Sequence, residues 1–282
     1  MTNHRSVSQM FTYSSCPRKY NYSYVDKKES MGESTGLVFG SAIHKAQEFN
    51  YRQKIESRVD RPYQEVEDFM VEYLIQKFKD NSDNPNFFKL KYGKRESGED
   101  IIASAKRCLK KLYDEVMTKL QPAYVEIGVT LDIFGQEFLM YLDVIDENDI
   151  IHDTKTSGSS YSEEDIEKNT QLAAYALGFR TKFGRKEKGV QLDVVVKTKE
   201  PKIQILKAEI TDEKISRLLN TLESINRGIE QKIFHPVDNG MVCSWCDFRD
   251  VCEADNNLPD AKVFAERLAK IMEIKKDNLE KI

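Results

Sequence analysis

The pattern of hydrophobic and polar positions changes character at about residue 120. Before that point apolar residues recur every three or four positions, as at Ala42, Ile43, Ala46 and Phe49, which is typical of amphipathic helices. This spacing predicts helices over residues 36–55, 64–79 and 98–119. Residues 81–98 are rich in Asn, Lys and Gly, so we expect an exposed loop there, a candidate lid or substrate-facing segment.

After residue 120, β-branched and aromatic runs indicate strands. We expect three successive strands over 123–133, 136–146 and 149–156, with turns at Phe134-Gly135 and Glu147-Asn148. The rest of the pattern predicts a helix over 163–183, strands over 190–196 and 202–210, and helices over 212–231 and 259–281. No internal repeat or low-complexity linker divides the chain, so we expect one mixed α/β domain over 1–282 with a helical insertion at 56–120.

Composition narrows the class of protein. The chain has 282 residues, of which 40% are hydrophobic and 32% charged, so it can bury a core and is neither a peptide-like scaffold nor a low-complexity chain. No apolar run approaches the roughly 18 residues that a membrane helix needs, and the first ten residues are polar. We therefore expect a cytoplasmic protein with no membrane partner.

Charge is segregated along the chain. The net charge of −4 excludes a simple basic protein that coats DNA. Residues 1–28 nevertheless carry five Lys or Arg against one Asp, and residues 180–199 carry seven against two acids. Such runs are usually solvated faces, so they indicate a binding surface only where they lie beside a functional site.

The sharpest local feature is the pair of acids and the lysine at the ends of the second and third predicted strands. Asp153 and Lys155 are two residues apart on a predicted strand, so their side chains point to the same side. Pairing with the preceding strand can set Asp143 beside Asp153. Two adjacent carboxylates repel, and Mg²⁺ relieves this because it prefers carboxylate oxygens. Lys155 could then assist phosphodiester hydrolysis. The alternative is a surface salt bridge on an edge strand.

Two helices add polar residues at helical spacing. Gly40, His44 and Glu48 share one stripe of the first helix, where Gly40 allows close backbone approach and neutral His44 can bind a metal. Gln171 and Tyr175 have the same spacing in the helix after the third strand. Each is commonplace by itself, and a structural role is the alternative for each.

The order of these residues resembles the PD-(D/E)xK nuclease superfamily in its RecB-like branch, over a stretch from Cys16 to Cys252. The resemblance implies a restriction-endonuclease-like mixed central sheet flanked by helices. It implies that Asp143, Asp153, Lys155, Gln171 and Tyr175 are catalytic, and that His44, Asp143, Asp153 and Thr154 bind Mg²⁺ or Mn²⁺. Glu126 matches an acidic position often seen on the first strand. Tyr141 is a departure, since the family often has Gly two residues before the first metal-binding Asp.

The cysteines form a second constellation. Cys243, Cys246 and Cys252 have ligand-like spacing, Cys16 lies far upstream in a Cys-Pro-Arg segment, and Cys108 is left over inside a predicted helix. Four thiolates suit zinc or an iron–sulfur cluster, which spacing alone does not separate, whereas disulfides suit a cytosolic chain poorly. The resemblance to AddB nucleases and CRISPR-associated RecB-like exonucleases implies a [4Fe-4S] cluster. It would join the segment 233–256 to Cys16 and so link the two terminal segments.

These observations together predict a metal-dependent DNA exonuclease acting on single-stranded DNA or DNA ends in recombination, repair or phage DNA processing. Because the sequence has no P-loop, a helicase or recombination protein is an expected partner. The alternatives are a non-catalytic iron–sulfur subunit for DNA binding or assembly, a CRISPR adaptation nuclease, and a redox or regulatory iron–sulfur protein. The tyrosines of the basic N-terminal segment either stack on unpaired bases or pack around the cluster, namely Tyr13, Tyr20, Tyr22 and Tyr24.

Overall fold

The computed structural model describes residues 5–30, 34–80, 97–244, 246–256 and 270. Most of the loop predicted at 81–98, most of the helix predicted at 259–281, and Trp245 lie outside the described residues. Within the described residues no helix is long and apolar enough to cross a membrane.

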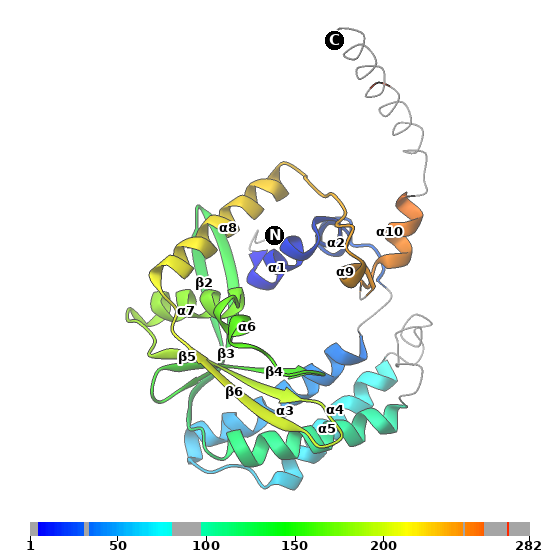
Figure 1. Cartoon of the computed structure of the whole chain (residues 1–282). Helices are drawn as coiled ribbons and strands as arrows, with labels where there is room; N and C mark the ends of the chain where they lie inside the picture. Colours follow the sequence, from blue (N-terminus) through cyan, green and yellow to red (C-terminus); the bar gives the residue numbers. More distant parts are fainter. Residues whose placement is uncertain (1–4, 31–33, 81–96, 245, 257–269, 271–282) are drawn as a thin grey trace.

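A mixed sheet forms the centre of the fold (Figure 1). Among the described residues it has six strands, β1 (Arg5–Ser6), β2 (Pro122–Ile133), β3 (Gln136–Asp146), β4 (Ile150–Ser157), β5 (Gly189–Val196) and β6 (Lys202–Ala208). The β2–β3, β3–β4 and β5–β6 pairs are antiparallel, and the β1–β3 and β4–β5 pairs are parallel. The five strands predicted from the sequence are all present, and β1 is the one that the pattern did not predict.

Strand β3 has an interrupted edge. Strand β2 pairs along one edge of β3 over most of its length, whereas the other edge pairs first with β1, at Phe138 and Leu139, and then with β4, at Val144 and Ile145. Residues 140–143 lie between these two pairings. The sheet therefore opens at this point, where side chains from neighbouring helices can meet the strand edge.

The predicted turn between the first two long strands is confirmed. Phe134 and Gly135 both have positive φ, 56° and 76°, which matches the two-residue hairpin turn that suits the twist of paired strands. The backbone N–H of Gly135 donates to Asp132 Oδ1 over 2.9 Å. This tight turn fixes the register of β2 against β3.

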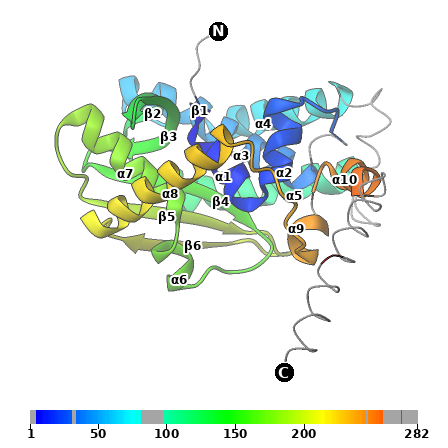
Figure 2. The same cartoon turned by 90° about the horizontal axis from the view of Figure 1, so that it is seen from above.

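Helices cover both faces of the sheet (Figures 1 and 2). On one face lie α3 (Thr35–Ser57), α4 (Tyr63–Asp80) and α5 (Gly98–Leu112), which continues as a π-helical turn, Tyr113–Met117. On the other lie α1 (Val7–Ser15), α7 (Thr170–Phe183) and α8 (Asp212–Glu230). The shorter helices are α2 (Pro17–Tyr20), followed by a π-helical turn (Asn21–Val25), α6 (Glu163–Glu167), α9 (Gly240–Ser244) and α10 (Arg249–Asn256).

Each helical layer buries its own apolar side chains against the sheet. One cluster joins α1, α7 and α8 to β3, β4 and β5, and the other joins α3, α4 and α5 to the opposite face. The segment 56–120 thus contributes to the second layer, and its status as an insertion stays a prediction. Helix α7 lies close to β3, because a Cβ on Gly178 would come within 2.8 Å of Met140 Sδ.

The single helix predicted over 163–183 is wrong in one respect. Helix α6 ends at Glu167 and α7 begins at Thr170. The break occurs because the Asn169 side chain caps α7, accepting a hydrogen bond from the backbone N–H of Leu172 over 3.0 Å. This restart sets the direction of α7 over the sheet.

Candidate active site

Four elements bring the six predicted side chains together at the open edge of β3. His44 comes from α3, Asp143 from β3, Asp153 and Lys155 from β4, and Gln171 and Tyr175 from the first turns of α7. Asp143 lies between the parts of β3 that pair with β1 and with β4. The junction of the strands therefore positions the acids.

Two carboxylates and an imidazole form a metal-binding geometry. Ligand atoms of His44, Asp143 and Asp153 all lie within 4.8 Å of one another, and His44 Nδ1 is 3.4 Å from Asp143 Oδ2. The backbone of Thr154 lies near His44 and opposes the lowering of its pKa, so a peptide group is present at the same place. Oxygen and imidazole donors at this separation suit a small divalent cation.

The surroundings of the Asp153 carboxylate suit a bound cation. Its side chain is fully buried, and Lys155 Nζ lies 2.8 Å from its Oδ2 as an ion pair outside hydrogen-bond geometry. Within the described residues both of its oxygens lack a hydrogen-bond donor. A buried carboxylate in this state is costly, and a bound cation removes the cost.

The electrostatics agree with that fit. Burial, together with the nearby Asp153 carboxylate, raises the pKa of Asp143 well above its ordinary value. Burial lowers the pKa of His44, which favours the neutral imidazole that binds metals. The raised pKa of Asp143 favours its protonated form when no cation is bound, and a divalent cation would let this carboxyl ionise.

A chain of hydrogen bonds links Lys155 to Asp143 through α7. Lys155 Nζ donates to Gln171 Oε1 over 2.7 Å, and Gln171 Nε2 donates to the Tyr175 hydroxyl over 2.7 Å. Tyr175 in turn donates to Asp143 Oδ1 over 2.9 Å. Burial raises the pKa of Tyr175, so its hydroxyl stays a donor. The predicted pairing of Gln171 with Tyr175 therefore orients both ends of the site.

Two acids noted in the sequence lie outside this group. Glu48 accepts from Lys45 over 2.6 Å and from Arg52 over 2.6 and 2.8 Å. Burial and the neighbouring Glu48 raise the pKa of Glu126, which places Glu126 beside this exposed charge cluster. Glu126 is not among the ligand atoms that meet within 4.8 Å. A Cβ at Gly40 would lie 3.6 Å from Thr156 Oγ1 on β4, an ordinary van der Waals distance, so the packing there does not depend on glycine.

Sequence reasoning missed a buried polar cluster behind the site. His152 points to the face opposite Asp153, where its Nδ1 lies 3.2 Å from Asp193 Oδ2 and its Nε2 3.6 Å from Asp146 Oδ2. Gln191 donates to Asp193 over 2.7 Å. Burial by itself would lower the pKa of His152, but the hydrogen bonds to Asp146 and Asp193 raise it to about 8. This cluster braces the strand that carries Asp153.

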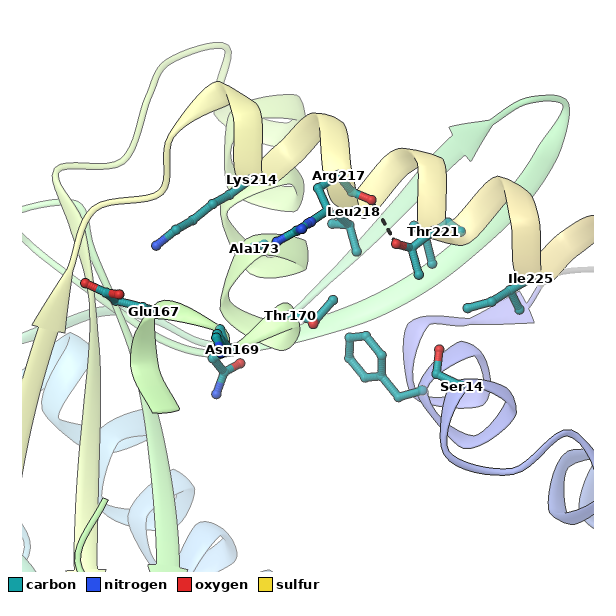
Figure 3. Close-up of a pocket in the computed structure, with 13 residues that line it drawn as sticks. Ser14, Glu167, Asn169, Thr170, Ala173, Lys214, Arg217, Leu218, Thr221 and Ile225 are labelled. Atoms are coloured by element: carbon teal, nitrogen blue, oxygen red, sulfur yellow. Dashed lines mark hydrogen bonds between the residues drawn. The ribbon is translucent and has the colours of Figure 1, made fainter. Parts of the chain in front are cut away.

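Two cavities meet beside the site. A cavity of about 300 Å³ is lined by Phe11, Tyr141, Asp143, Gln171 and Tyr175, among others. A neighbouring cavity of about 410 Å³ lies between α1, α7 and α8 and also contacts Phe11. In Figure 3, Lys214 and Arg217 extend from α8 towards this second cavity. Phe11 therefore separates the candidate active site from a space bordered by cations.

The four cysteines of the predicted motif surround one small cavity. Cys16, Cys243, Cys246 and Cys252 line a space of about 150 Å³. Contacts between the terminal segments hold it together, since Lys19 Nζ lies 3.0 Å from Asp247 and Tyr22 donates to Asp255 over 2.6 Å. Both views show α2 beside α9 and α10 (Figures 1 and 2). Cys108 is fully buried in the other helical layer, as expected of a core residue.

The N-terminal tyrosines pack inside the protein. Tyr13, Tyr20 and Tyr22 are buried, and Tyr24 is 39% exposed. The Tyr20 ring stacks on Phe234 at 6.2 Å, and the Tyr22 ring lies 5.7 Å from Phe248 in the cysteine segment. Of the two interpretations of this segment, packing fits the three buried rings.

Comparisons with known proteins give a family match and a solved structure of similar fold. Residues 4–253 match the PD-(D/E)XK nuclease superfamily. Among solved structures, a "putative exonuclease" from Eubacterium rectale has a TM-score of 0.56 and 19% identity over 82% of each chain. SSO0001 has a TM-score of 0.35 and 15% identity, over 73% of this chain and 94% of that one. No curated protein matches the sequence.

The family match covers most of the chain and includes every residue of the site and all four cavity-lining cysteines. The shared fold with the Eubacterium rectale protein confirms the predicted mixed sheet flanked by helices. Affiliation with the RecB-like or AddB-like branches stays a prediction. The chain itself belongs to the PD-(D/E)XK nuclease superfamily.

Proposed function

We propose that the protein is a Mg²⁺- or Mn²⁺-dependent DNA exonuclease. The observation that carries the proposal is the meeting of His44, Asp143 and Asp153 within 4.8 Å, with Lys155 beside Asp153. Thr154 would add its backbone oxygen to these ligands, since its peptide group already contacts His44. A divalent cation bound there would polarise the phosphate and lower the pKa of bound water.

The residues around the cation would position the reacting groups. Lys155 lies where its ammonium can bind the attacking water or a phosphate oxygen on which charge develops. Gln171 fixes that ammonium by accepting its hydrogen bond, and Tyr175 fixes Asp143. Preorganisation of this kind stabilises the transition state without rearrangement during the reaction. A non-catalytic DNA-binding subunit would have no use for it.

The cations beside the site support a nucleic-acid substrate. Lys214 and Arg217 border the cavity next to Phe11, and within the described residues neither has an ion-pair partner. Lys and Arg near a hydrolytic site bind phosphates along a strand. Recombination, repair, phage DNA processing or CRISPR adaptation as the context, and a helicase as partner, stay predictions.

We propose further that Cys16, Cys243, Cys246 and Cys252 hold a [4Fe-4S] cluster. All four line one cavity, yet within the described residues no three of these sulfurs meet within 4.8 Å. Zinc at 2.3 Å from four sulfurs would bring them to about 3.8 Å from one another. Four thiolates suit either metal, and the choice of iron rests on the resemblance of the cysteine motif to AddB-like nucleases. The role of the cluster would be structural, because it would tie the two terminal segments together.

The test of the nuclease is digestion of end-labelled single- and double-stranded DNA with Mg²⁺ or Mn²⁺. We expect products that shorten from an end, and we expect a chelator and Asp153→Ala each to abolish them. Nicked circular plasmid as a product would indicate an endonuclease instead. Undigested DNA under every metal condition would refute the enzyme and leave the DNA-binding alternative.

A further inference from the structure

Tyr141 occupies an unusual place beside the candidate active site. It lies two residues before Asp143 on β3, in the stretch 140–143 that pairs with neither β1 nor β4. Tyr141 also lines the cavity that contains Asp143, Gln171 and Tyr175. The side chain is 53% exposed although it borders this cavity. A large ring is thus available to a molecule bound at the site.

The neighbouring strand holds this ring in place. Gly128 on β2 pairs directly with Tyr141, and a Cβ on Gly128 would lie only 3.3 Å from Tyr141 Cε1. The absence of a side chain at Gly128 therefore lets the ring lie close against the strand. Three ring atoms, Cδ1, Cε1 and Cζ, would lie within 4 Å of that Cβ, and Tyr141 nevertheless stays 53% exposed. Such a ring loses little freedom when a flat group stacks on it.

A cation lies next to the same position. Lys182, at the end of α7, donates to the Gly128 carbonyl over 3.4 Å, and its side chain is exposed. Lys182 and Tyr141 thus both adjoin Gly128, and an ammonium and an aromatic ring are the groups that bind the phosphate and the base of a nucleotide. This combination is the usual basis for binding single strands.

We propose that Tyr141 stacks on an unpaired base next to the phosphodiester bond that is cut, and thereby selects single-stranded DNA. The inference rests on the proposed nuclease function and specifies its substrate. A base is free to stack on Tyr141 only if it has left its partner, which costs a few kcal/mol in a duplex and little in a single strand. Tyr141 acts as a positioning residue, since it holds the nucleotide and does not touch the metal ligands.

The experiment compares single strands whose terminal nucleotide carries a base or lacks one. Stacking contributes about 1–3 kcal/mol per base, so we expect the wild-type kcat/KM to fall roughly 5- to 150-fold on the abasic strand. We expect Tyr141→Ala to lose the same factor on the normal strand and to show no further loss on the abasic strand. Tyr141→Phe keeps the ring and should behave like the wild type.

Tyr124→Ala is the matched control. Tyr124 is a 40% exposed tyrosine on the same hairpin that does not line the cavity, so its removal should leave both rates unchanged. Equal loss on both strands by Tyr141→Ala would indicate a structural role, and a rate equal to wild type would also overturn the inference.

Binding separates this inference from the proposed function. If the wild type cuts neither strand, the nuclease proposal fails. Titration of the same strands in the absence of divalent metal then tests stacking alone. A weaker Kd for the abasic strand in the wild type, and equal values in Tyr141→Ala, would support stacking. Equal values in both proteins would overturn it.

Discussion

Tyr175 on α7 donates a hydrogen bond to Asp143 on β3 over 2.9 Å, although the two residues lie 32 positions apart. This bond lets a helix between β4 and β5 orient a carboxylate on β3, earlier in the chain. The same helix accepts the ammonium of Lys155 through Gln171. The packing of α7 on the sheet therefore positions the side chains of the site. Gly178 contributes to this packing because it lets α7 lie close to β3.

Removing Tyr175 or Gln171 should reduce the rate without abolishing it. Tyr175→Phe leaves Asp143 Oδ1 without its donor, and Gln171→Ala frees the Lys155 ammonium. We expect kcat to fall about 10- to 100-fold in each variant, against about 10³-fold or more for Asp153→Ala. Cleavage rates at saturating metal measure this difference. Complete loss in all three with unchanged DNA binding would contradict the division of roles.

Replacing Asp153 should abolish cleavage without lowering the melting temperature. Its carboxylate is buried beside Asp143 and has no hydrogen-bond donor in the described residues. Asp153→Asn removes the repulsion, so in the presence of a chelator we expect a melting temperature equal to or above that of the wild type, with no cleavage. Lys155→Ala is the comparison, because it removes the ammonium that lies 2.8 Å from Asp153 and should lower the melting temperature. The reverse order in circular dichroism melts would contradict this assignment.

The meeting of the candidate site's residues could be predicted from the sequence because they lie on regular elements in a fixed order. Alternation on β4 and the four-residue spacing on α7 define where Asp153, Lys155, Gln171 and Tyr175 point. The position of Glu126 was not predictable, because its positive φ of 49° interrupts the alternation of β2. The contact of His152 with Asp193 depends on the parallel pairing of β4 with β5, which no local pattern encodes.

The His152 cluster should make stability depend on pH. The pKa of His152 is about 8 in the folded protein and about 6.5 in the unfolded chain. Protonated His152 therefore adds about 2 kcal/mol to the free energy of unfolding, and this stabilisation is fully present below pH 6.5. It is lost as the pH rises through 8. Urea unfolding at pH 6 and pH 9 measures this drop in the free energy of unfolding. The His152→Gln variant should not show the drop. His235→Gln, at an exposed position, should retain it. An equal pH response in wild type and His152→Gln would contradict the assignment.

Arg217 should contribute to DNA affinity through a phosphate. It borders the cavity next to Phe11, so Arg217→Ala should weaken binding several-fold and reduce the slope of log K against log salt by about 1. Arg227→Ala is the matched control, since Arg227 is an exposed arginine on the same helix outside both cavities. Fluorescence anisotropy with a labelled strand at several salt concentrations tests this. Identical slopes of log K against log salt in the two variants would show that Arg217 does not contact a phosphate of the DNA.

The cysteine cavity gives the last prediction. If it holds [4Fe-4S], protein purified without oxygen should be brown and contain about four iron and four sulfide per chain. Alanine at Cys16, Cys243, Cys246 or Cys252 should remove the iron, because each lines the same cavity. Each variant should also loosen the contact between the terminal segments, read as faster proteolysis around Tyr22 and Phe248, whose rings pack together.

Cys108→Ala is the control for the cluster, since Cys108 is buried in the opposite helical layer and should leave the iron content unchanged. Elemental analysis of the wild type and the five single variants separates the possibilities. Zinc in place of iron would overturn the cofactor and leave the nuclease proposal intact, because the cavity shares no lining residue with the cavity around Asp143. Iron lost with Cys108 but kept without Cys16 would overturn the assignment of the ligands themselves.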